Sequence, residues 1–166
     1  MKTKLLQGKY NVKAKITIKA SKHEVWEILK DFNNVYTWAP GVKESYGLNN
    51  KYQEVGAGRH CKLEGFGEID EYIQQWDEGS GFVYDVTPLG PLTNVYSSWY
   101  LSSVNKSMTT LKVTLSYDIR FGLFGKIMHK LIMRKKLNEA LPQTLESVKK
   151  RVETGEMIRP LLEQPA

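Results

Sequence analysis

The scarcest reactive residue in this sequence of 166 residues is cysteine, and the single Cys61 excludes an internal disulfide. The three histidines lie far apart, and no two of them are spaced as a pair of metal ligands. No apolar run approaches the length of a membrane span. Near the start, only Leu5-Leu6 stand where a secretory signal needs a longer apolar core. The sequence therefore predicts a cytoplasmic protein and implies no metal or other cofactor.

Catalytic signatures are equally scarce. The chain has no Gly-x-Ser-x-Gly nucleophile elbow. The glycines at Gly65-Phe66-Gly67 lead into a predicted strand rather than into the helix that a dinucleotide-binding loop requires. Cys61 shares strand parity with Leu63, which favours a buried and inert thiol. The residues by themselves therefore indicate no nucleophile and no nucleotide site.

Acidic residues are fewer than basic ones: the sequence has 18 aspartates and glutamates and 24 lysines and arginines, which gives a net charge of +6. The cations gather on the last predicted helix, within 126–136 and 149–151. Such a cluster is either a solvated helix face or a weak contact for an anionic membrane surface. Basic and aromatic residues do not interleave on one strand as a stacking platform requires, so no nucleic-acid partner is expected. No pattern fixes the oligomeric state.

What the sequence does contain is clear periodicity. Residues 10–18 alternate apolar and polar side chains, which is typical of a half-buried strand. Ser21 and Glu24 form a capping box at the start of a helix, and a second short helix over 35–38 is predicted after it. Further strands are predicted over 42–48, 59–64, 66–76, 82–86, 93–104 and 111–121. A helix is predicted over 123–153, with a kink at Pro142.

Consecutive strands joined by short turns predict one antiparallel sheet of seven strands. A sheet that is wet on one face must cover the other, and the C-terminal helix is the only large element left to do so. The apolar stripe of this helix is predicted to contain Ile127, Leu131, Leu137, Leu141, Leu145, Val148 and Val152. The sequence thus predicts a single α+β domain over residues 1–154 and a loosely ordered tail over 155–166.

Three stretches also carry a family pattern: ITIKASKHEVWEILKDFNNVYTWAPGV, EIDEYIQQWDEGSGFVYDV and FGLFGKIMHKLIMRKKLNEALPQTLESVKKRVE. Together they resemble the START-like, or Bet v 1-like, superfamily (SRPBCC), and within it the polyketide cyclase/dehydrase and lipid-transport family. The resemblance covers roughly residues 10–154. It implies a helix-grip fold, in which a curved sheet wraps around the long C-terminal helix. Members of the superfamily include carriers, hormone receptors, aromatase/cyclases, ubiquinone-binding proteins and co-chaperones, and the fold does not choose among them.

A space between sheet and helix is predicted to bind a hydrophobic small molecule. Its walls would come from the apolar faces of the strands, with the loop at Pro40 acting as a gate. The predicted ligand-contacting side chains in these walls are Trp38, Phe82, Tyr84, Val95, Trp99, Val113, Leu115, Tyr117, Ile119, Phe121 and Leu131. The nine Tyr, four Trp and five Phe of the chain could equally fill this space and leave a solid core.

Polar side chains near this space are the candidates for anchoring or chemistry. Arg59 shares parity with Cys61, so an inward guanidinium could bind a carboxylate or an enolate. Arg59, Glu68 and Tyr84 are the weak candidates for polarising a carbonyl or moving a proton. Alternatively, Arg59 pairs with Glu68 or Asp70 in a purely structural role, or these residues face outward.

Arg134 and Asn138 fall inside the predicted stripe on ideal helix geometry. Either they are polar anchors that reach the cavity, or the kink at Pro142 changes the phase and leaves them exposed, which is the favoured alternative. The main functional prediction is binding, or transport, of a hydrophobic small molecule or lipid. The alternatives are a polyketide aromatase/cyclase or dehydratase, and a non-catalytic protein that contacts an anionic membrane.

Overall fold

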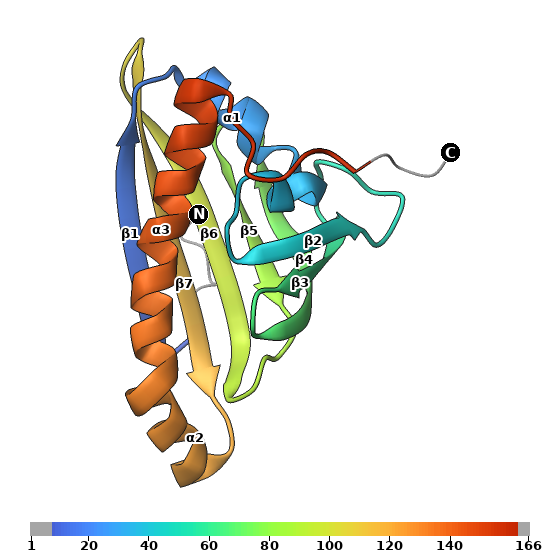
Figure 1. Cartoon of the computed structure of the whole chain (residues 1–166), viewed down its shortest axis with the longest axis vertical. Coiled ribbons are helices and arrows are strands. Elements are labelled where there is room, and N and C mark those ends of the chain that lie inside the picture. The colour runs from blue at the N-terminus through green and yellow to red at the C-terminus, as the bar shows by residue number, and fades with distance from the viewer. Residues whose placement is uncertain (1–7, 163–166) are drawn as a thin grey trace.

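The structure is a computed structural model that describes residues 8–162. Short helices follow the first strand, and a long helical segment closes the chain (Figure 1). The strands are β1 (Tyr10–Ile18), β2 (Val42–Gly47), β3 (Gly58–Leu63), β4 (Gly67–Asp77), β5 (Gly81–Val86), β6 (Leu92–Asn105) and β7 (Met108–Ile119). The helices are α1 (Lys22–Leu29), the 3₁₀ helix η1 (Phe32–Thr37), α2 (Gly122–Met128), the π turn η2 (His129–Met133) and α3 (Arg134–Thr154).

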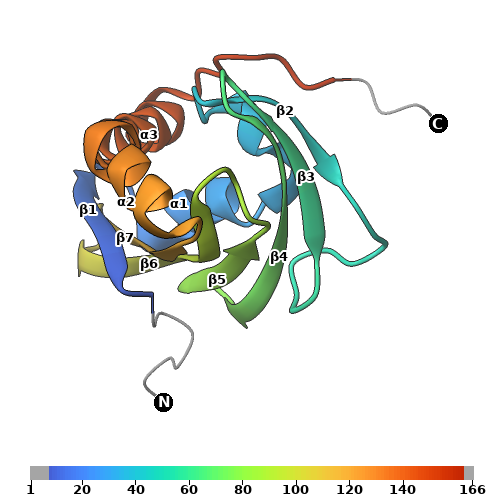
Figure 2. The ribbon, with the colours of Figure 1, turned by 90° about the horizontal axis from the view of Figure 1, so that it is seen from below.

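The seven strands form one antiparallel sheet in the order β1-β7-β6-β5-β4-β3-β2. Register shifts interrupt the pairing of β2 with β3, of β4 with β5 and of β6 with β7. Such bulges bend a sheet, and the sheet curls around an interior that α3 closes on one side (Figure 2). The predicted fold is confirmed: a curved seven-stranded antiparallel sheet, two short helices after β1 and a long C-terminal helix.

Local sequence explains how the first two elements form. In β1, Val12 and Ile18 are buried while Lys13 and Lys15 are exposed, as alternation requires. The helix that follows begins at the predicted capping box. The Ser21 hydroxyl accepts from the Glu24 N–H at 3.3 Å, and the Glu24 carboxylate accepts from the Ser21 N–H at 2.7 Å. Helix α1 then buries its apolar side, which contains Val25, Trp26 and Leu29.

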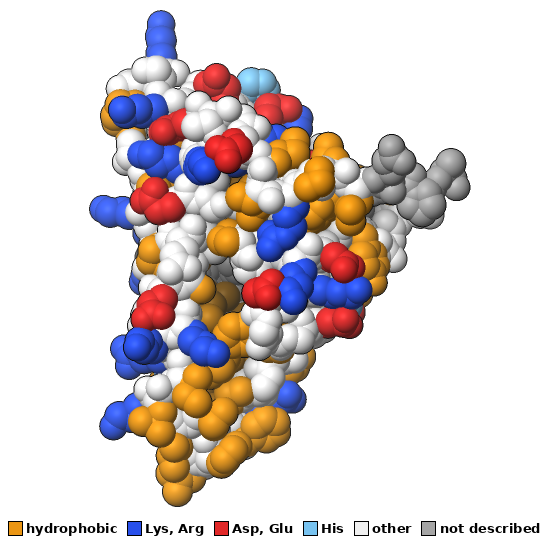
Figure 3. All heavy atoms as spheres, in the orientation of Figure 1, with side chains coloured by type: hydrophobic (Ala, Val, Ile, Leu, Met, Phe, Trp, Pro, Cys, Tyr) orange, Lys and Arg blue, Asp and Glu red, His pale blue; other side chains and the backbone are white. Residues whose placement is uncertain are grey.

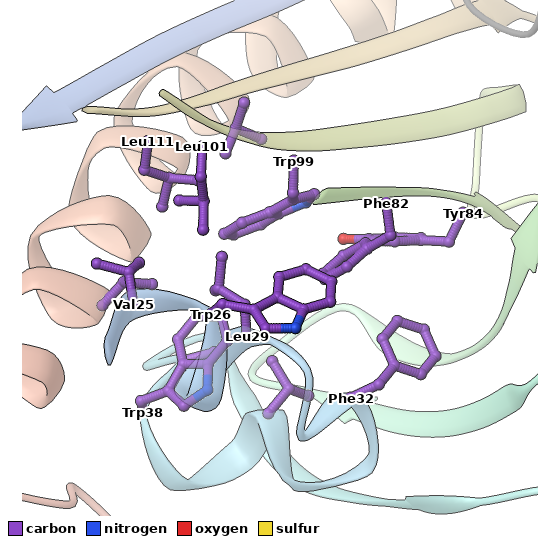
Figure 4. Packing of buried hydrophobic residues seen from close by; sticks show 14 of the residues in the cluster. Val25, Trp26, Leu29, Phe32, Trp38, Phe82, Tyr84, Trp99, Leu101 and Leu111 are labelled. Carbon is purple, nitrogen blue, oxygen red and sulfur yellow. The ribbon is translucent and has the colours of Figure 1, made fainter. Parts of the chain in front are cut away.

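Aromatic side chains fill the part of the interior next to α1 (Figure 4). Trp26 lies 4.9 Å from Trp76, whose ring stacks on Phe82 with 5.7 Å between centroids. The indole N–H groups of both tryptophans donate to Glu78, at 2.9 and 2.8 Å. Aromatic rings at these separations stabilise the fold by more than the burial of their apolar area alone would. This end of the interior is therefore solid, and open space lies farther from α1.

The C-terminal helix departs from the predicted stripe in its first turns. Ile127 and Leu131 were expected to face the sheet but are 48% and 68% exposed. The reason is the π turn η2, in which the N–H of Arg134 donates to the carbonyl of His129, five residues back. This wider turn changes the helical phase of every residue before it. His129 and Met133 are buried instead, whereas Leu145 and Val148 are buried as predicted.

The segment after α3 contacts the loop that follows η1. Gly155, with a φ of 74°, ends the helix in the left-handed conformation that favours glycine. The Ile158 N–H donates to the Thr37 carbonyl at 2.9 Å, and the Arg159 guanidinium donates to the Ala39 carbonyl at 3.3 Å. Residues 155–162 thus lack regular structure but are hydrogen-bonded to the core. No helix within residues 8–162 is both long and apolar enough to cross a membrane.

Candidate ligand cavity

A cavity of about 300 Å³ lies between α3 and the concave face of the sheet. Figure 3 shows the hollow beside α3, with hydrophobic side chains at its floor. The sheet contributes Ile69, Trp99 and Leu115 to its walls, and α3 contributes Leu137 and Leu141. These residues come from β4, β6, β7 and α3, so the cavity exists only when the whole domain is folded.

The mouth of the cavity lies between α3 and the turn that joins β3 to β4. Lys136 on α3 and Phe66 in that turn both line the cavity. The Lys136 ammonium lies 4.6 Å from the centroid of the Phe66 ring, within the range of a cation–π attraction. Both side chains are partly exposed to solvent. This contact therefore links the helix to the opposite rim at the point where a ligand would enter.

The inner end of the cavity is polar, because Arg59 and Glu71 form an ion pair there and both line the cavity. Their side chains are only 6% and 7% exposed. The Nε of Arg59 donates to Oε2 of Glu71, and its Nη1 donates to the Phe32 carbonyl at 2.6 Å. Arg59 thus pairs with Glu71 and not with Glu68 or Asp70, the predicted structural partners. Residues Arg59 and Glu71 lie opposite each other in the register of β3 and β4, which brings them together on the inner face.

The surroundings fix the charge of this polar end. Burial alone would lower the pKa of the Arg59 guanidinium, but Glu71, Cys61 and Tyr84 together raise it above its ordinary value, so Arg59 stays charged. Burial, with a contribution from Glu71, raises the pKa of the Cys61 thiol to about 12. Burial also raises the pKa of the Tyr84 hydroxyl. At neutral pH the polar end therefore presents the charged Arg59 guanidinium beside Glu71, together with a neutral thiol and a neutral phenol.

Part of the hydrogen-bonding capacity of the ion pair is left over. Among the described residues, no hydrogen bond engages Nη2 of Arg59 or Oε1 of Glu71. The guanidinium lies against two neighbouring rings, 3.8 Å from the Phe32 centroid and 5.2 Å from that of Tyr84. Stacking fixes its orientation. A donor and an acceptor of fixed direction are thus available to a ligand.

The structure separates the predicted site residues into three groups. Five of them line the cavity: Trp38, Arg59, Tyr84, Trp99 and Leu115. Others pack in the core without reaching the cavity: Phe82, Val95, Val113, Tyr117 and Ile119. The remaining ones are exposed: Glu68, Phe121, Leu131, Arg134 and Asn138.

Each displaced group has a local cause. The Tyr117 hydroxyl is hydrogen-bonded to Nε2 of the buried His129 at 2.7 Å, which turns it toward α2 and η2 rather than the cavity. Glu68 lies on the outer face of β4, 3.5 Å from His60. Upstream of Pro142, the inward positions are Met133 and Leu137. Each of these directly precedes one of the two polar residues expected in the stripe, Arg134 and Asn138, which therefore face solvent.

Sequence reasoning missed Glu71, Met133 and Lys136. The signal for Glu71 was present, because Ile69 and Ile73 flank it at strand spacing and define the inner face of β4. The candidate Glu68 instead has the opposite parity, which it shares with Phe66 at the start of the strand predicted over 66–76. Phe66 lies in the turn before β4, where side chains do not alternate between the two faces of the sheet. Met133 is the last residue of η2, a phase change for which the sequence has no recognised signature. Lys136 lies after it in α3, next to Leu137 of the predicted stripe.

Comparison with known protein families identifies one that spans most of the chain. The family described as polyketide cyclase / dehydrase and lipid transport matches residues 9–153. The chain therefore belongs to that family. The comparison with curated proteins found no match.

Solved structures with the same fold share little sequence with this chain. A Thermus thermophilus protein is 17% identical, with a TM-score of 0.72, over 88% of this chain and 99% of that one. A START superfamily protein from Mycobacterium smegmatis is 17% identical, with a TM-score of 0.69, over 86% and 97%. The Zhui aromatase/cyclase from a Streptomyces species is 14% identical, with a TM-score of 0.68, over 88% and 97%. At these identities the similarity establishes the fold alone.

Proposed function

We propose that this protein binds a hydrophobic small molecule or lipid that carries one polar group. The supporting observation is a cavity with apolar walls that ends on the buried pair of Arg59 and Glu71. The apolar part of the ligand would lie between α3 and the sheet. Its polar group, a hydroxyl, carbonyl or carboxylate, would meet the unused Nη2 of Arg59. A few fixed polar groups in an apolar pocket are the usual basis of ligand orientation.

The expected affinity is moderate. Burying ten methylene groups would gain about 8 kcal/mol at about 0.8 kcal/mol each. Association costs on the order of 4–15 kcal/mol, and dispersion contacts with the walls and hydrogen bonds at the polar end are expected to offset this cost. The balance gives a dissociation constant near micromolar, which corresponds to about −8 kcal/mol. Such a value suits a carrier that must also release its ligand.

Native mass spectrometry of the protein purified from its host tests this proposal. A ligand-bound species should be present and should disappear on mild collisional activation, leaving the mass of the chain alone. Binding of the apolar anionic dye ANS provides a second measurement. Ala140→Trp should weaken ANS binding at least tenfold, because Ala140 lines the cavity and the larger side chain would occupy the mouth.

Gln143→Trp is the matched control, since this exposed residue of α3 does not line the cavity. ANS affinity of the control should stay within about twofold of wild type. Equal loss in both variants, or no loss in Ala140→Trp, would reject the cavity as the binding site. A clean apo mass from the host together with no ANS binding would reject the proposal as a whole.

The second candidate is a polyketide cyclase or dehydratase, and one observation favours it. A carboxylate and a guanidinium lie side by side at the inner end of the cavity. In a cyclisation, Glu71 would take a proton from a methylene flanked by carbonyls, and Arg59 would stabilise the resulting enolate oxygen. Glu71→Gln should then abolish turnover of a polyketide analogue while its binding persists. Unchanged turnover in this variant would exclude Glu71 as the base.

A further inference from the structure

The end of the molecule farthest from α1 exposes an unusual amount of apolar surface. It consists of the two residues after β7, α2 and the π turn η2, which lie at the lower end in Figure 1. Six large apolar side chains are between 41% and 76% exposed there. We call them the apolar tip: Phe121, Leu123, Phe124, Ile127, Leu131 and Ile132. In Figure 3 this end tapers and is largely hydrophobic. Concentrated apolar surface of this kind marks an interaction site.

The fold holds these side chains outward. Phe121 has a φ of 70°, a left-handed conformation that is rare for a bulky residue and turns the chain sharply into α2. Gly125 is buried against the end of β7, where a Cβ would overlap the carbonyl oxygen of Arg120. Because Gly125, His129 and Met133 occupy the inner positions, the apolar residues between them must face solvent. The exposure is thus a consequence of backbone geometry rather than of loose packing.

The charge around the apolar tip has one sign. Between Asp118 and Glu139 the sequence has six cations and no acidic residue. The six cations are Arg120, Lys126, Lys130, Arg134, Lys135 and Lys136. All six are exposed, and within residues 8–162 only Lys135 has an acidic side chain within 4 Å, Glu139 at 3.9 Å. The surface is therefore complementary to a negatively charged partner.

We propose that the apolar tip docks on an anionic lipid bilayer. Phe and Leu side chains next to lysines are the composition of segments that lie in the membrane interface. Four of the six cations are lysines, which act as mobile point charges and suit a diffuse layer of headgroups better than a fixed protein site. A tapering end can also enter a fluid interface, whereas a rigid partner would need a matching groove.

Docking would place the cavity beside the lipid surface, because Met133, Lys136 and Leu137 line the cavity and follow the tip directly along the helix.

The proposal does not rest on ligand binding, and it is tested without any ligand. Vesicles of phosphatidylcholine, with and without phosphatidylserine, are sedimented with the full chain at low and high salt. Binding should require phosphatidylserine and should fall at high salt, because salt screens the headgroup charge.

Variants separate the two contributions. Leu123→Ser combined with Phe124→Ser should lower vesicle binding at least tenfold. Lys126→Glu combined with Lys130→Glu should do the same, since each cation near such a surface contributes about fivefold. The control with the same change of charge is Lys13→Glu combined with Lys15→Glu, two exposed residues on β1. It should lose about twofold at most.

Insertion of the apolar tip into the bilayer is measured with Phe124→Trp. The fluorescence emission of the introduced tryptophan should shift to shorter wavelength on anionic vesicles. Near-ultraviolet circular dichroism of each variant shows that it is folded. Three results would overturn the proposal: no binding of wild type to anionic vesicles, equal losses in the tip and β1 variants, or an unshifted emission. Concentration-dependent dimers that the Leu123 and Phe124 variants abolish, without vesicle binding, would assign the tip to a second copy of the chain and also overturn it.

Discussion

At the scale of single residues, the polar end of the cavity depends on the balance between burial and pairing. Arg59 and Glu71 are almost completely buried, and a buried charge without its partner costs far more than the pair does. The pair therefore adds little net stability compared with apolar residues of the same size. Its presence in a cavity wall agrees with the anchoring role proposed for it above.

Glu71→Ala should lower the free energy of unfolding by about 3–5 kcal/mol, because it leaves the Arg59 guanidinium buried without its carboxylate. The double variant Arg59→Met with Glu71→Leu should recover most of this loss. Chemical denaturation of the three proteins measures both effects. If Glu71→Ala lowered the free energy of unfolding by less than about 1 kcal/mol, this would show that water reaches Arg59 freely and compensates for the missing carboxylate.

Cys61 provides a chemical probe of the same wall. With a pKa of about 12, only about one thiol in ten thousand is ionised at pH 8, and the thiolate is the reactive form. Iodoacetamide should therefore alkylate the folded protein at least about a hundredfold more slowly than the urea-denatured chain at the same pH. The rate should rise as pH increases toward 12. Equal rates in the folded and denatured protein would contradict the burial of this thiol.

At the scale of elements, strands were easier to predict than the terminal helix. In β1 and β7, strict alternation specifies which side chains face the interior. The structure agrees as far as Ile119, but Phe121, the last residue of the predicted strand, lies beyond β7 and is exposed. In β4 the parity was misread because the turn at Gly65 and Gly67 separates Phe66 from the strand. In the terminal segment one π turn changes which residues face inward, and periodicity assumes an unbroken α-helix. Local irregularities thus limit what a pattern can predict.

Gly125→Ala tests how α2 is fixed. The added methyl group would overlap the Arg120 carbonyl oxygen, so α2 should shift and the free energy of unfolding should fall by about 1–3 kcal/mol. Amide hydrogen exchange within α2 should also become faster. Gly41→Ala is the matched control, because a Cβ at Gly41 would meet no atom within 4 Å and its φ is not positive. Equal stability of the two variants would show that α2 is not pinned at Gly125.

At the scale of the whole molecule, the sequence predicted the architecture but not the shape of the interior. The order of the elements follows from alternation, capping and turn residues, which are local. Whether the interior is hollow depends on how the rings of Trp26, Trp76 and Phe82 pack against one another at one end. Their packing leaves space beside Trp99 and Leu115. Such packing is decided jointly by residues from distant parts of the chain, so no single stretch reveals it.

The strand order also affects how the chain is assembled during its synthesis. Strand β1 is made first, yet within residues 8–162 the strand that pairs with it is β7, which starts at Met108. About ninety residues must therefore leave the ribosome before the first strand can form its hydrogen bonds. Until then its apolar face has no sheet to cover it. Chaperone dependence during translation should accordingly be set by the N-terminal strand, and a circular permutant that makes β1 directly after β7 should depend on chaperones less.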